Sequence, residues 1–210
     1  MSDLPLKKQI IQKAIELFNQ RGFFDIRMRD ISSALDISVG SVTYHFKSKE
    51  ALMESIYRYM LKTLEGLDIS GRLFQKKGEE LEVAQVYLSY MQHFRFFFQD
   101  TLDIIRTYPQ IGQQHRQQVL EELNIIKNIL YMQAGKGTLA AEPAPGIYDT
   151  LAEMIWQSLH FWFARQTILG NTEPGWGDAL RTIGHLVYPY LSEERKAENL
   201  EIMPGIGLAK

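Results

Sequence analysis

Apolar residues recur along most of the chain at the spacing of an amphipathic α-helix. In the first segment, Ile10, Ala14, Leu17 and Phe18 fall on one face of such a helix, and Gly22 follows them where a C-terminal cap is expected. No clean alternation of apolar and polar residues is bounded by turns, and the Asn-Gly and Asp-Gly pairs of tight hairpins do not occur. The pattern therefore predicts an all-α fold.

The remaining helices are predicted from the same periodicity and from the residues that interrupt it. Prolines and glycines separate the long helical segments, because proline cannot continue a helix and glycine loses more backbone entropy in one than any other residue. Two short helices are expected first, and longer ones follow. The predicted segments after the first helix are Met28–Leu35, Ser38–Tyr44, Ser48–Leu64, Glu80–Phe97, Gln99–Thr107, Pro109–Ala134, Gly146–Leu169 and Gly175–Tyr190.

The two short helices are joined by a turn of the helix-turn-helix type. The turn is Asp36-Ile37-Ser38. Aspartate tolerates left-handed backbone geometry, and serine is a favoured N-cap for the helix that follows. Four apolar residues have the spacing that packs two short helices against each other and against the first helix: Ile31, Leu35, Ile37 and Val42. This predicts a three-helix head whose last helix enters the major groove of double-stranded DNA.

The helix after Ser38 has the composition of a helix that reads a groove. Its exposed side is expected to offer small and hydroxylated residues, and Gly40 leaves room for close approach to a sugar-phosphate backbone. Basic residues on both sides of this helix are placed to contact phosphates. The candidate DNA-binding residues are Arg27, Arg29, Ser38, Val39, Gly40, Ser41, Thr43, Tyr44, His45, Lys47 and Lys49.

The distribution of charge agrees with a nucleic-acid-binding head. Residues 1–64 hold 10 lysines and arginines against 7 aspartates and glutamates, a net charge of +3, while residues 65–210 carry a net charge of −5. A basic end on a slightly acidic body suits a small head that binds a polyanion. The signal is modest, because the whole chain carries only −2.

The segment Met28–Leu52 resembles the DNA-binding segment of the TetR family of transcriptional repressors. The family pattern has an Ile-Ala pair, a Gly-Val-Ser turn, a glycine two residues later, an aromatic-His-Phe cluster, and Lys-Glu-x-Leu opening the next helix. The matching residues here are Ile31-Ser32, Asp36-Ile37-Ser38, Gly40, Tyr44-His45-Phe46 and Lys49-Glu50-Ala51-Leu52. The resemblance covers about the first quarter of the chain.

This sequence departs from the family pattern at several positions. Ile26 and Arg27 stand where members usually carry hydroxylated residues that cap the second helix and contact phosphate. Asp25 is therefore expected to take over the capping, and Arg27 to replace a hydroxyl contact with phosphate by a charged one. Thr43 stands where tyrosine is common, which moves that contact to Tyr44, and Val39 stands where lysine is frequent. The operator sequence therefore cannot be carried over from the family.

The resemblance implies a domain organisation and a mechanism. It implies a helix-turn-helix domain over residues 1–48, a linking helix over residues 49–67, and a larger helical bundle over residues 68–210 for ligand sensing and dimerisation. It also implies a homodimer formed through about residues 146–169 and 175–190. The expected function is a homodimeric regulator, a repressor, which releases a palindromic operator when it binds a small, largely apolar ligand.

Aromatic residues and methionine concentrate in two stretches of the larger domain, Tyr87–Phe98 and Met154–Phe163. Most of these side chains are core residues by default. A pocket for an apolar small molecule is nevertheless built from such residues with a few polar ones among them. The candidate ligand-binding residues are Tyr90, Met91, Phe94, Phe97, Phe98, Tyr131, Trp156, His160 and Phe163.

Other functional classes are weighed against the same residues. The chain has no cysteine, and its five histidines show no metal-ligand spacing, so we expect no catalytic site, no metal and no cofactor. The alternatives that stay open are a helical protein-binding adaptor and a repressor that responds to no ligand. The N-terminal residues do not resemble a secretory signal, and no apolar stretch approaches about 18 residues, so we expect a cytoplasmic protein without a membrane span.

Overall fold

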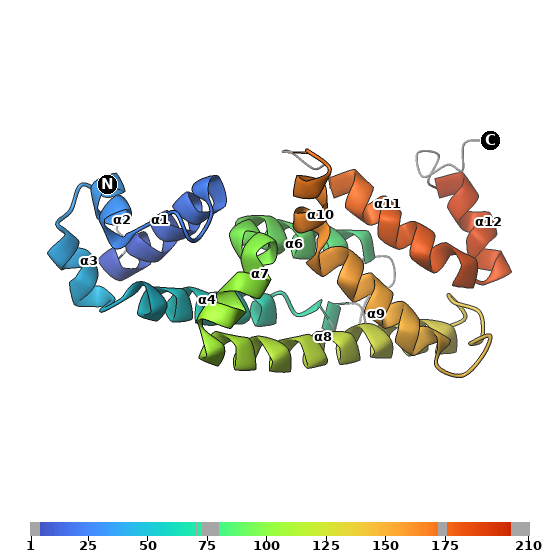
Figure 1. The fold of residues 1–210 in the computed structure, drawn as a ribbon. Helices are drawn as coiled ribbons and strands as arrows, with labels where there is room; N and C mark the ends of the chain where they lie inside the picture. The colour runs from blue at the N-terminus through green and yellow to red at the C-terminus, as the bar shows by residue number, and fades with distance from the viewer. Residues whose placement is uncertain (1–4, 70, 73–79, 172–175, 203–210) are drawn as a thin grey trace. The chain divides into compact units, whose positions relative to one another are not determined.

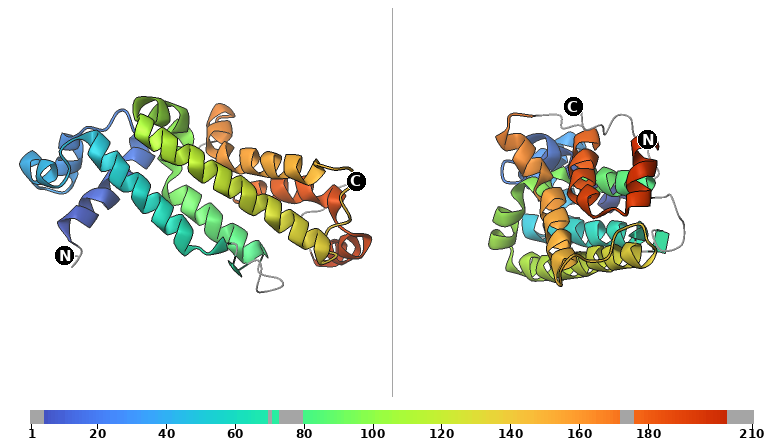
Figure 2. Two further views of the ribbon diagram at one scale, coloured as in Figure 1. Left: turned by 90° about the horizontal axis from the view of Figure 1, so that it is seen from below. Right: turned by 90° about the vertical axis from the view of Figure 1, so that its right-hand side faces the viewer.

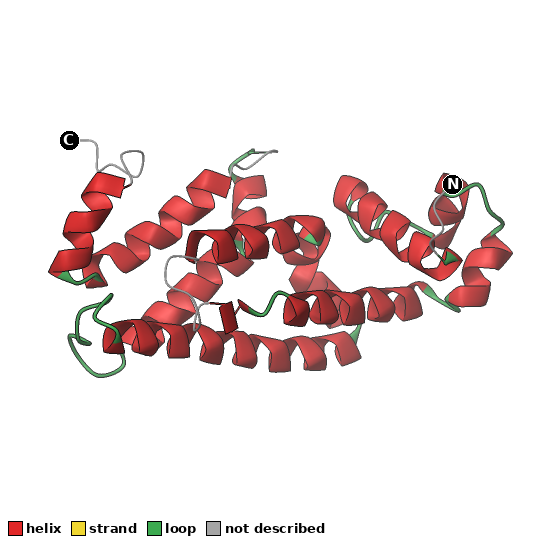
Figure 3. Ribbon diagram, turned by 180° about the vertical axis from the view of Figure 1, so that it is seen from behind, coloured by secondary structure: helices red, strands yellow, loops and turns green. Residues whose placement is uncertain are grey.

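The structure is a computed structural model that describes residues 5–69, 71–72, 80–171 and 176–202. Within these ranges it consists of helices joined by loops, and one antiparallel bridge pairs Leu139 with Leu191 (Figures 1 and 3). The all-α prediction is confirmed. The elements are α1 (Leu6–Arg21), α2 (Met28–Ala34), α3 (Val39–His45), α4 (Lys49–Gly66), α6 (Glu80–His93), α7 (Arg95–Thr107), α8 (Pro109–Gly135), α9 (Ile147–His160), α10 (Trp162–Ile168), α11 (Trp176–Val187), the 3-10 helix η1 (Tyr188–Tyr190) and α12 (Glu193–Ile202).

Two predicted long helices are each broken once. The segment 80–97 is interrupted at Phe94, and the segment 146–169 is interrupted at Phe161, where the backbone leaves the helical region. Neither break carries the proline or glycine that marks helix ends in a sequence, so the sequence pattern predicts continuous helices there. The sequence pattern also predicts no helix at α12, because the residues of α12 are mostly polar and show no apolar stripe. None of the helices in the described ranges combines the length and apolarity that crossing a membrane requires.

The chain divides into two compact units. Unit 1 is Met1–Ile69 with Gln85–Arg116, and unit 2 is Ser70–Ala84 with Gln117–Lys210. Both α6 and α8 therefore contribute to each unit. These packing units do not test the functional boundaries expected at residues 48 and 67, which stay predictions.

In unit 1, the three N-terminal helices enclose a small apolar core. Phe18 of α1, Ile31 of α2 and Val42 of α3 are each at most 1% exposed, as the periodicity of the sequence predicts. Phe46 and Leu52 extend this core into the start of α4. Because helices as short as α2 and α3, with seven residues each, are not stable alone, this shared burial holds α3 in place.

A cluster of aromatic residues around Phe23 joins these helices to α7 inside unit 1. The Phe23 ring lies 4.9 Å from the Phe18 ring, 6.3 Å from the Phe96 ring and 5.9 Å from the Tyr108 ring, measured between centroids. The Phe23 backbone N–H also donates to the Asp100 carboxylate at 3.3 Å. The turn that follows α1 is therefore fixed to α7 by both apolar and polar contacts.

Unit 2 is organised around α9. Tyr148, Leu151, Ala152 and Ile155 of α9 form a buried cluster with Leu130 of α8, and apolar side chains of α11 and η1 pack against it. In Figure 2, α9 lies beside the C-terminal part of α8, and α11 packs against α9. This packing confirms that the predicted apolar faces of these helices are core faces.

A buried histidine connects α4 to α8 in unit 1. His115 is 8% exposed, and its Nδ1 lies 3.1 Å from the Tyr57 hydroxyl. The Phe97 ring packs against the His115 ring with the centroids 5.1 Å apart. Burial lowers the pKa of His115 to about 4, because the charged imidazolium loses its hydration in this apolar setting.

We expect His115 to make the protein acid-sensitive. Its pKa rises from about 4 in the folded state to about 6.5 when the chain unfolds, so the unfolded state takes up a proton first as the pH falls. The stability contributed by neutral His115 is present above pH 6.5 and is lost towards pH 4, and the linkage relation gives a loss of about 2 kcal/mol between pH 7 and pH 5. Urea unfolding at these two pH values checks this.

The comparison variant for this prediction is His115→Gln, which has no proton to gain. The free energy of unfolding of this variant should change less between pH 7 and pH 5 than that of the wild type. His185→Gln is the control, because His185 is an exposed histidine of α11. An equal loss of stability in wild type and His115→Gln would contradict the assignment.

Candidate DNA-binding surface

The turn between α2 and α3 has the geometry that the sequence predicts. Asp36 adopts a left-handed backbone conformation with φ of 54°, and the Ile37 N–H donates to the Ser32 carbonyl at 3.0 Å. Ser38 is the N-cap of α3, and its Oγ accepts from the Ser41 N–H at 3.0 Å. These local bonds set the direction in which α3 leaves the turn.

The two faces of α3 differ sharply. Val42 is fully buried, and Phe46, which directly follows the helix, is 2% exposed. On the outer side, Tyr44 is 77% exposed and Val39 is 45% exposed, and Gly40 lies between the two on the surface. The core thus holds α3 by one face and leaves the opposite face, with Tyr44 on it, exposed to solvent.

The hydroxyl groups of α3 already take part in hydrogen bonds within the helix. Thr43 Oγ1 donates to the carbonyl of Val39 or Gly40, each 3.1 Å away, and the hydroxyls of Ser38 and Ser41 bond to each other at 2.9 Å. Each hydroxyl oxygen keeps acceptor capacity that a DNA group could use. Contacts between these residues and DNA stay predictions.

Basic residues flank α3 at the surface. Arg27, Arg29 and Lys47 are exposed, and His45 is half-buried with its ring 5.2 Å from that of Tyr44. Helix α2 is not capped by Asp25 as expected. Its N-cap is Arg27, whose backbone N–H donates to the Asp30 carboxylate at 2.7 Å. Asp30, the third residue of α2, thus caps the helix by accepting from the Arg27 backbone. The Arg27 guanidinium takes no part in this hydrogen bond.

Lys49 differs from the other candidates because its ammonium group is engaged inside the head. Lys49 Nζ donates to the Phe23 carbonyl at 2.5 Å and lies 3.5 Å from the Phe24 carbonyl. It also lies 4.1 Å from the centroid of the Phe23 ring. Partial burial lowers the pKa of Lys49, although the carboxylates of Asp25 and Asp30 act in the opposite direction. A contact between Lys49 and phosphate stays a prediction.

Asn19, a residue that the sequence pattern does not single out, links the end of α1 to the junction of α6 and α7. Its side-chain nitrogen donates to the His93 carbonyl at 2.8 Å, and its side-chain oxygen accepts from the Phe96 N–H at 2.8 Å. Arg95 donates to the Asn19 carbonyl at 2.7 Å. These partners lie more than 70 residues away in the sequence, so no local signal identifies them.

The nine predicted ligand-binding residues fall into two groups, one in each unit. In unit 1, Tyr90, Phe94 and Phe98 are buried in one aromatic cluster, with the Tyr90 and Phe94 centroids 5.2 Å apart. Met91 and Phe97 are buried there too. The unit 2 residues are Tyr131, Trp156, His160 and Phe163. A ligand-binding role for either group stays a prediction.

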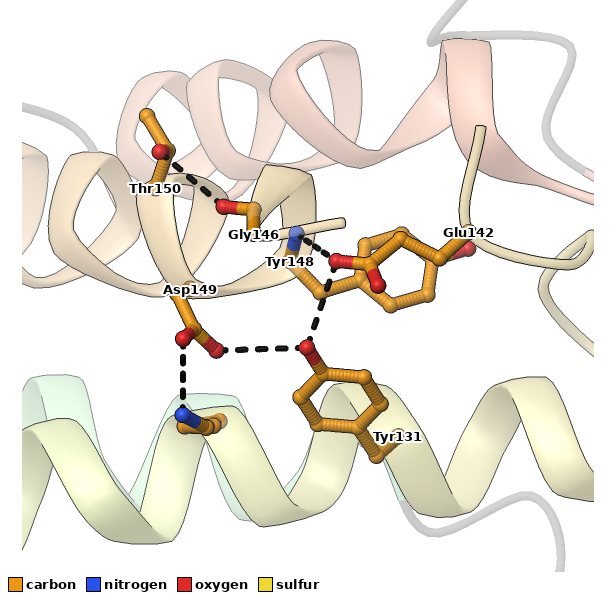
Figure 4. Close-up of polar contacts among 7 residues, drawn as sticks. Tyr131, Glu142, Gly146, Tyr148, Asp149 and Thr150 are labelled. Atoms are coloured by element: carbon orange, nitrogen blue, oxygen red, sulfur yellow. Dashed lines mark hydrogen bonds and ion pairs between the residues drawn. The ribbon is translucent and has the colours of Figure 1, made fainter. Parts of the chain in front are cut away.

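In unit 2, Tyr131 belongs to a polar cluster that ties α8 to the start of α9 (Figure 4). The Tyr131 hydroxyl donates to the carboxylate of Glu142 at 3.2 Å or of Asp149 at 3.3 Å. Asp149 also pairs with Lys127 at 2.7 Å, a contact that lowers the Asp149 pKa. Partial desolvation and the two nearby carboxylates raise the pKa of Tyr131 to about 12. This hydroxyl therefore acts as a donor that positions the loop before α9.

Trp156 and His160 form a second cluster in unit 2, on the following turns of α9. Their rings stack with centroids 4.5 Å apart, and the Trp156 indole N–H donates to the Glu122 carboxylate of α8 at 2.9 Å. His160 and Phe163 are at most 3% exposed. Glu122 carried no signal in the sequence, because a single glutamate on a helix is most often a surface residue.

The all-α fold and the exposed α3 held by a helix-turn-helix define a DNA-binding transcriptional regulator. Family comparison agrees: the family model "Bacterial regulatory proteins, tetR family" matches residues 10–56, and the model "Bacterial transcriptional repressor" matches residues 78–198. The chain therefore belongs to the TetR family of transcriptional regulators, as the resemblance implied. Its relatives are regulators and not enzymes.

Individual relatives agree with this assignment. The chain is similar to the probable HTH-type transcriptional regulator YttP of Bacillus subtilis (strain 168), with 33% identity over 93 residues, 42% of this chain and 45% of that protein. The matches to curated relatives span about half of their length.

Solved structures share the fold. A TetR-family regulator from Marinobacter aquaeolei VT8 has a TM-score of 0.83 and 21% identity, with 97% of this chain and 99% of that chain covered. A structure described as a SmeT–triclosan complex has a TM-score of 0.61 and 15% identity, with 89% and 92% covered. At these identities the likeness shows the fold alone.

Proposed function

We propose that the chain represses transcription by binding double-stranded DNA as a homodimer, with α3 of each protomer in one major groove. The observation that carries the proposal is the outward face of α3, where Tyr44 is 77% exposed beside the surface residues Val39 and Gly40. An aromatic ring this exposed does not add to the stability of the monomer's core. A groove-reading helix needs such a face.

Each candidate residue has a role in this proposal. Tyr44, Thr43 and Ser41 face the base edges, whereas Gly40 and Val39 allow close approach to the groove. His45, Lys47, Arg27 and Arg29 neutralise phosphates on either side of α3, and Ser38 both caps α3 and faces the DNA backbone. Lys49 acts on phosphate only if it leaves the contacts it makes with Phe23 and Phe24.

The dimer is proposed to form through residues 146–169 and 175–190, which include α9, α10 and α11. Gly175, the first residue of the second segment, lies outside the described residues. On α9 and directly after it, Met154 is 44% exposed and Phe161 is 39% exposed, so this part of unit 2 presents apolar side chains to a partner. Two-fold pairing presents two copies of α3 to a palindrome, which supplies the sequence specificity that one short helix lacks.

Regulation is proposed to work by linkage. A small, largely apolar ligand that prefers the conformation unable to bind DNA lowers the DNA affinity by its differential affinity for the two conformations. The triclosan complex of a protein with the same fold supports this response, because it places a small apolar molecule in such a fold. The function requires access to the chromosome, so we place the protein in the cytoplasm.

Selection of genomic fragments by the purified protein tests the proposal. Fragments with two half-sites about one helical turn of DNA apart, retained more weakly as salt increases, would support a DNA-binding dimer. Absence of specific retention, or binding that salt does not change, would contradict it and favour the protein-binding adaptor. Specific retention that no apolar compound reverses would leave a ligand-independent repressor.

A further inference from the structure

The helix α3 lacks the side chains that most often read a base by hydrogen bonding. Its seven residues, all of which the structure describes, are Val-Gly-Ser-Val-Thr-Tyr-His. In the major groove, guanine is read most often by arginine or lysine, adenine by asparagine or glutamine, and cytosine by aspartate or glutamate. None of these residue types occurs in α3. If α3 enters the groove as proposed above, it must recognise bases through contacts of another kind.

Thr43 directs its hydroxyl group towards the backbone of its own helix. Thr43 Oγ1 lies 3.1 Å from the Val39 carbonyl oxygen and 3.1 Å from the Gly40 carbonyl oxygen, and it donates its one proton to one of them. The Cβ atom of threonine carries only one other heavy substituent outside the backbone, the Cγ2 methyl group. Because the oxygen faces the helix backbone, the methyl group is the part of the Thr43 side chain that is left for an outside partner.

The two serines at the start of α3 are also engaged within the helix. The hydroxyls of Ser38 and Ser41 bond to each other at 2.9 Å, and Ser38 Oγ accepts from the Ser41 N–H at 3.0 Å. One hydroxyl proton of this pair is therefore used, and only the other remains for another acceptor. Of the three hydroxyl protons on Ser38, Ser41 and Thr43, two thus serve the helix itself.

Val39 adds a second methyl-bearing side chain on the same side of α3. It is 45% exposed, although valine is among the residue types most often fully buried. Val39 precedes Thr43 by four positions, and residues four apart lie one above the other on a helix. Gly40, beside Val39 at the surface, has no side chain that would hold these methyl groups away from the base edges. Val39 and Thr43 therefore form an apolar stripe along α3.

Thymine is the base that carries a matching group. Its C5 methyl group projects into the major groove, where small apolar groups such as the threonine methyl contact it, whereas cytosine has only a hydrogen at that carbon. We propose that α3 selects thymine through the methyl groups of Val39 and Thr43, so that each half-site carries thymine at the base pairs that these two residues face. The proposal rests on the DNA binding proposed above and adds the base that the helix selects.

Deoxyuridine tests the proposal, because it lacks only the C5 methyl group of thymidine and pairs with adenine in the same way. Each thymine of a selected fragment is replaced singly by deoxyuridine, and fluorescence anisotropy measures the affinity of the full-length protein at one fixed salt concentration. At the thymines that face α3, the affinity should fall about fourfold, the factor for one methyl group that loses its apolar contact. Replacements in the DNA that flanks the half-sites should leave the affinity unchanged.

Two substitutions at Thr43 separate the methyl group from the hydroxyl group. Thr43→Val keeps a methyl and removes the hydroxyl, whereas Thr43→Ser keeps the hydroxyl and removes the methyl. The readout is the ratio of the affinities for the thymine fragment and for its deoxyuridine counterpart. At the base pair that faces Thr43, this ratio should persist in Thr43→Val and disappear in Thr43→Ser. Val39→Ala should remove the ratio at the base pair that faces Val39.

Thr63→Ser is the matched control for Thr43→Ser. Thr63 lies on α4, outside the proposed interface, and its Oγ1 donates to the Tyr59 carbonyl at 2.7 Å. This substitution thus removes the same methyl group from a helical threonine with the same kind of backbone contact. Its affinity ratio should equal that of the wild type, and cooperative thermal unfolding of each variant shows that the variant is folded.

Two outcomes would overturn the proposal. The first is a set of selected fragments in which no replacement by deoxyuridine within a half-site weakens binding. The second is a ratio that survives in Thr43→Ser, which would assign the base contact to the hydroxyl or to another residue. In both cases specific retention shows that the proposed regulator stands and only the thymine assignment fails. If the protein retains no fragment at all, the proposed regulator itself fails.

Discussion

Replacing Gly40 by glutamate is expected to lower the affinity for DNA by at least about a hundredfold, or about 2.7 kcal/mol. Gly40 lies on the outer face of α3 between Val39 and Ser41, where a negative charge would meet the phosphates that line the groove. The longer side chain would also hold the helix away from the DNA backbone. Fluorescence anisotropy with a selected fragment, at one fixed salt concentration, measures the change.

The same substitution should leave the fold intact, which makes the result easy to interpret. A Cβ added at Gly40 meets Ser38 Oγ at 3.5 Å, an ordinary van der Waals distance. Glutamate is also a better helix former than glycine by about 0.5–1 kcal/mol. The free energy of unfolding should therefore stay equal or rise slightly.

Gln92→Glu is the matched control for Gly40→Glu. It introduces the same charge at an exposed position of α6, outside the proposed interface. Its DNA affinity should stay within about threefold of the wild type, because exposed charges more than a Debye length apart are largely screened. If Gly40→Glu also retained wild-type affinity, α3 would not be the helix that enters the groove.

The helix-turn-helix could be predicted from the sequence because its determinants are local. The left-handed Asp36, the Ser38 cap and the alternating burial of α3 all involve residues within a few positions of one another. The backbone preferences of the turn residues and the hydrophobic periodicity both predict a helix-turn-helix along this segment. Such agreement allows a motif to be recognised from sequence. The breaks at Phe94 and Phe161 could not be read in the same way, because both lie within runs of aromatic residues.

The contacts made by Asn19 and Glu122 could not be predicted from the sequence, for a different reason. Asn19 bonds to backbone groups of α6 and α7, and backbone groups carry no residue type that a sequence could reveal. Glu122 meets Trp156, which lies 34 positions away, and glutamates with such partners look like surface glutamates in a sequence. Tertiary contacts between common residue types leave no pattern to recognise.

Lys49 shows how a correct motif can leave the role of a residue undetermined. The sequence places a lysine beside the recognition helix, and its position predicts a phosphate contact. A lysine side chain has a long flexible stem, so its ammonium group can reach either solvent or a neighbouring apolar surface. In the structure it reaches the carbonyls of Phe23 and Phe24.

Lys49→Met is therefore expected to destabilise the head by about 2–3 kcal/mol, because methionine fills a similar volume but cannot donate to the Phe23 carbonyl or face the Phe23 ring as a cation. Hydrogen bonds from a charged group are the stronger class, and Phe23 itself is buried, so its carbonyl is left without its Lys49 donor. Thermal and urea unfolding measure the loss.

Lys47→Met supplies the contrast, because Lys47 is exposed and only two residues away. It should change the free energy of unfolding by less than about 0.5 kcal/mol, as exposed substitutions usually do. The slope of log affinity for DNA against log salt should nevertheless fall by about 1 per protomer, the value for one lost phosphate contact. If Lys49→Met instead lowered the salt slope at unchanged stability, Lys49 would be a phosphate ligand that leaves the aromatic ring of Phe23 when DNA binds, and the expected contribution of Lys49 to the stability of the head would be wrong.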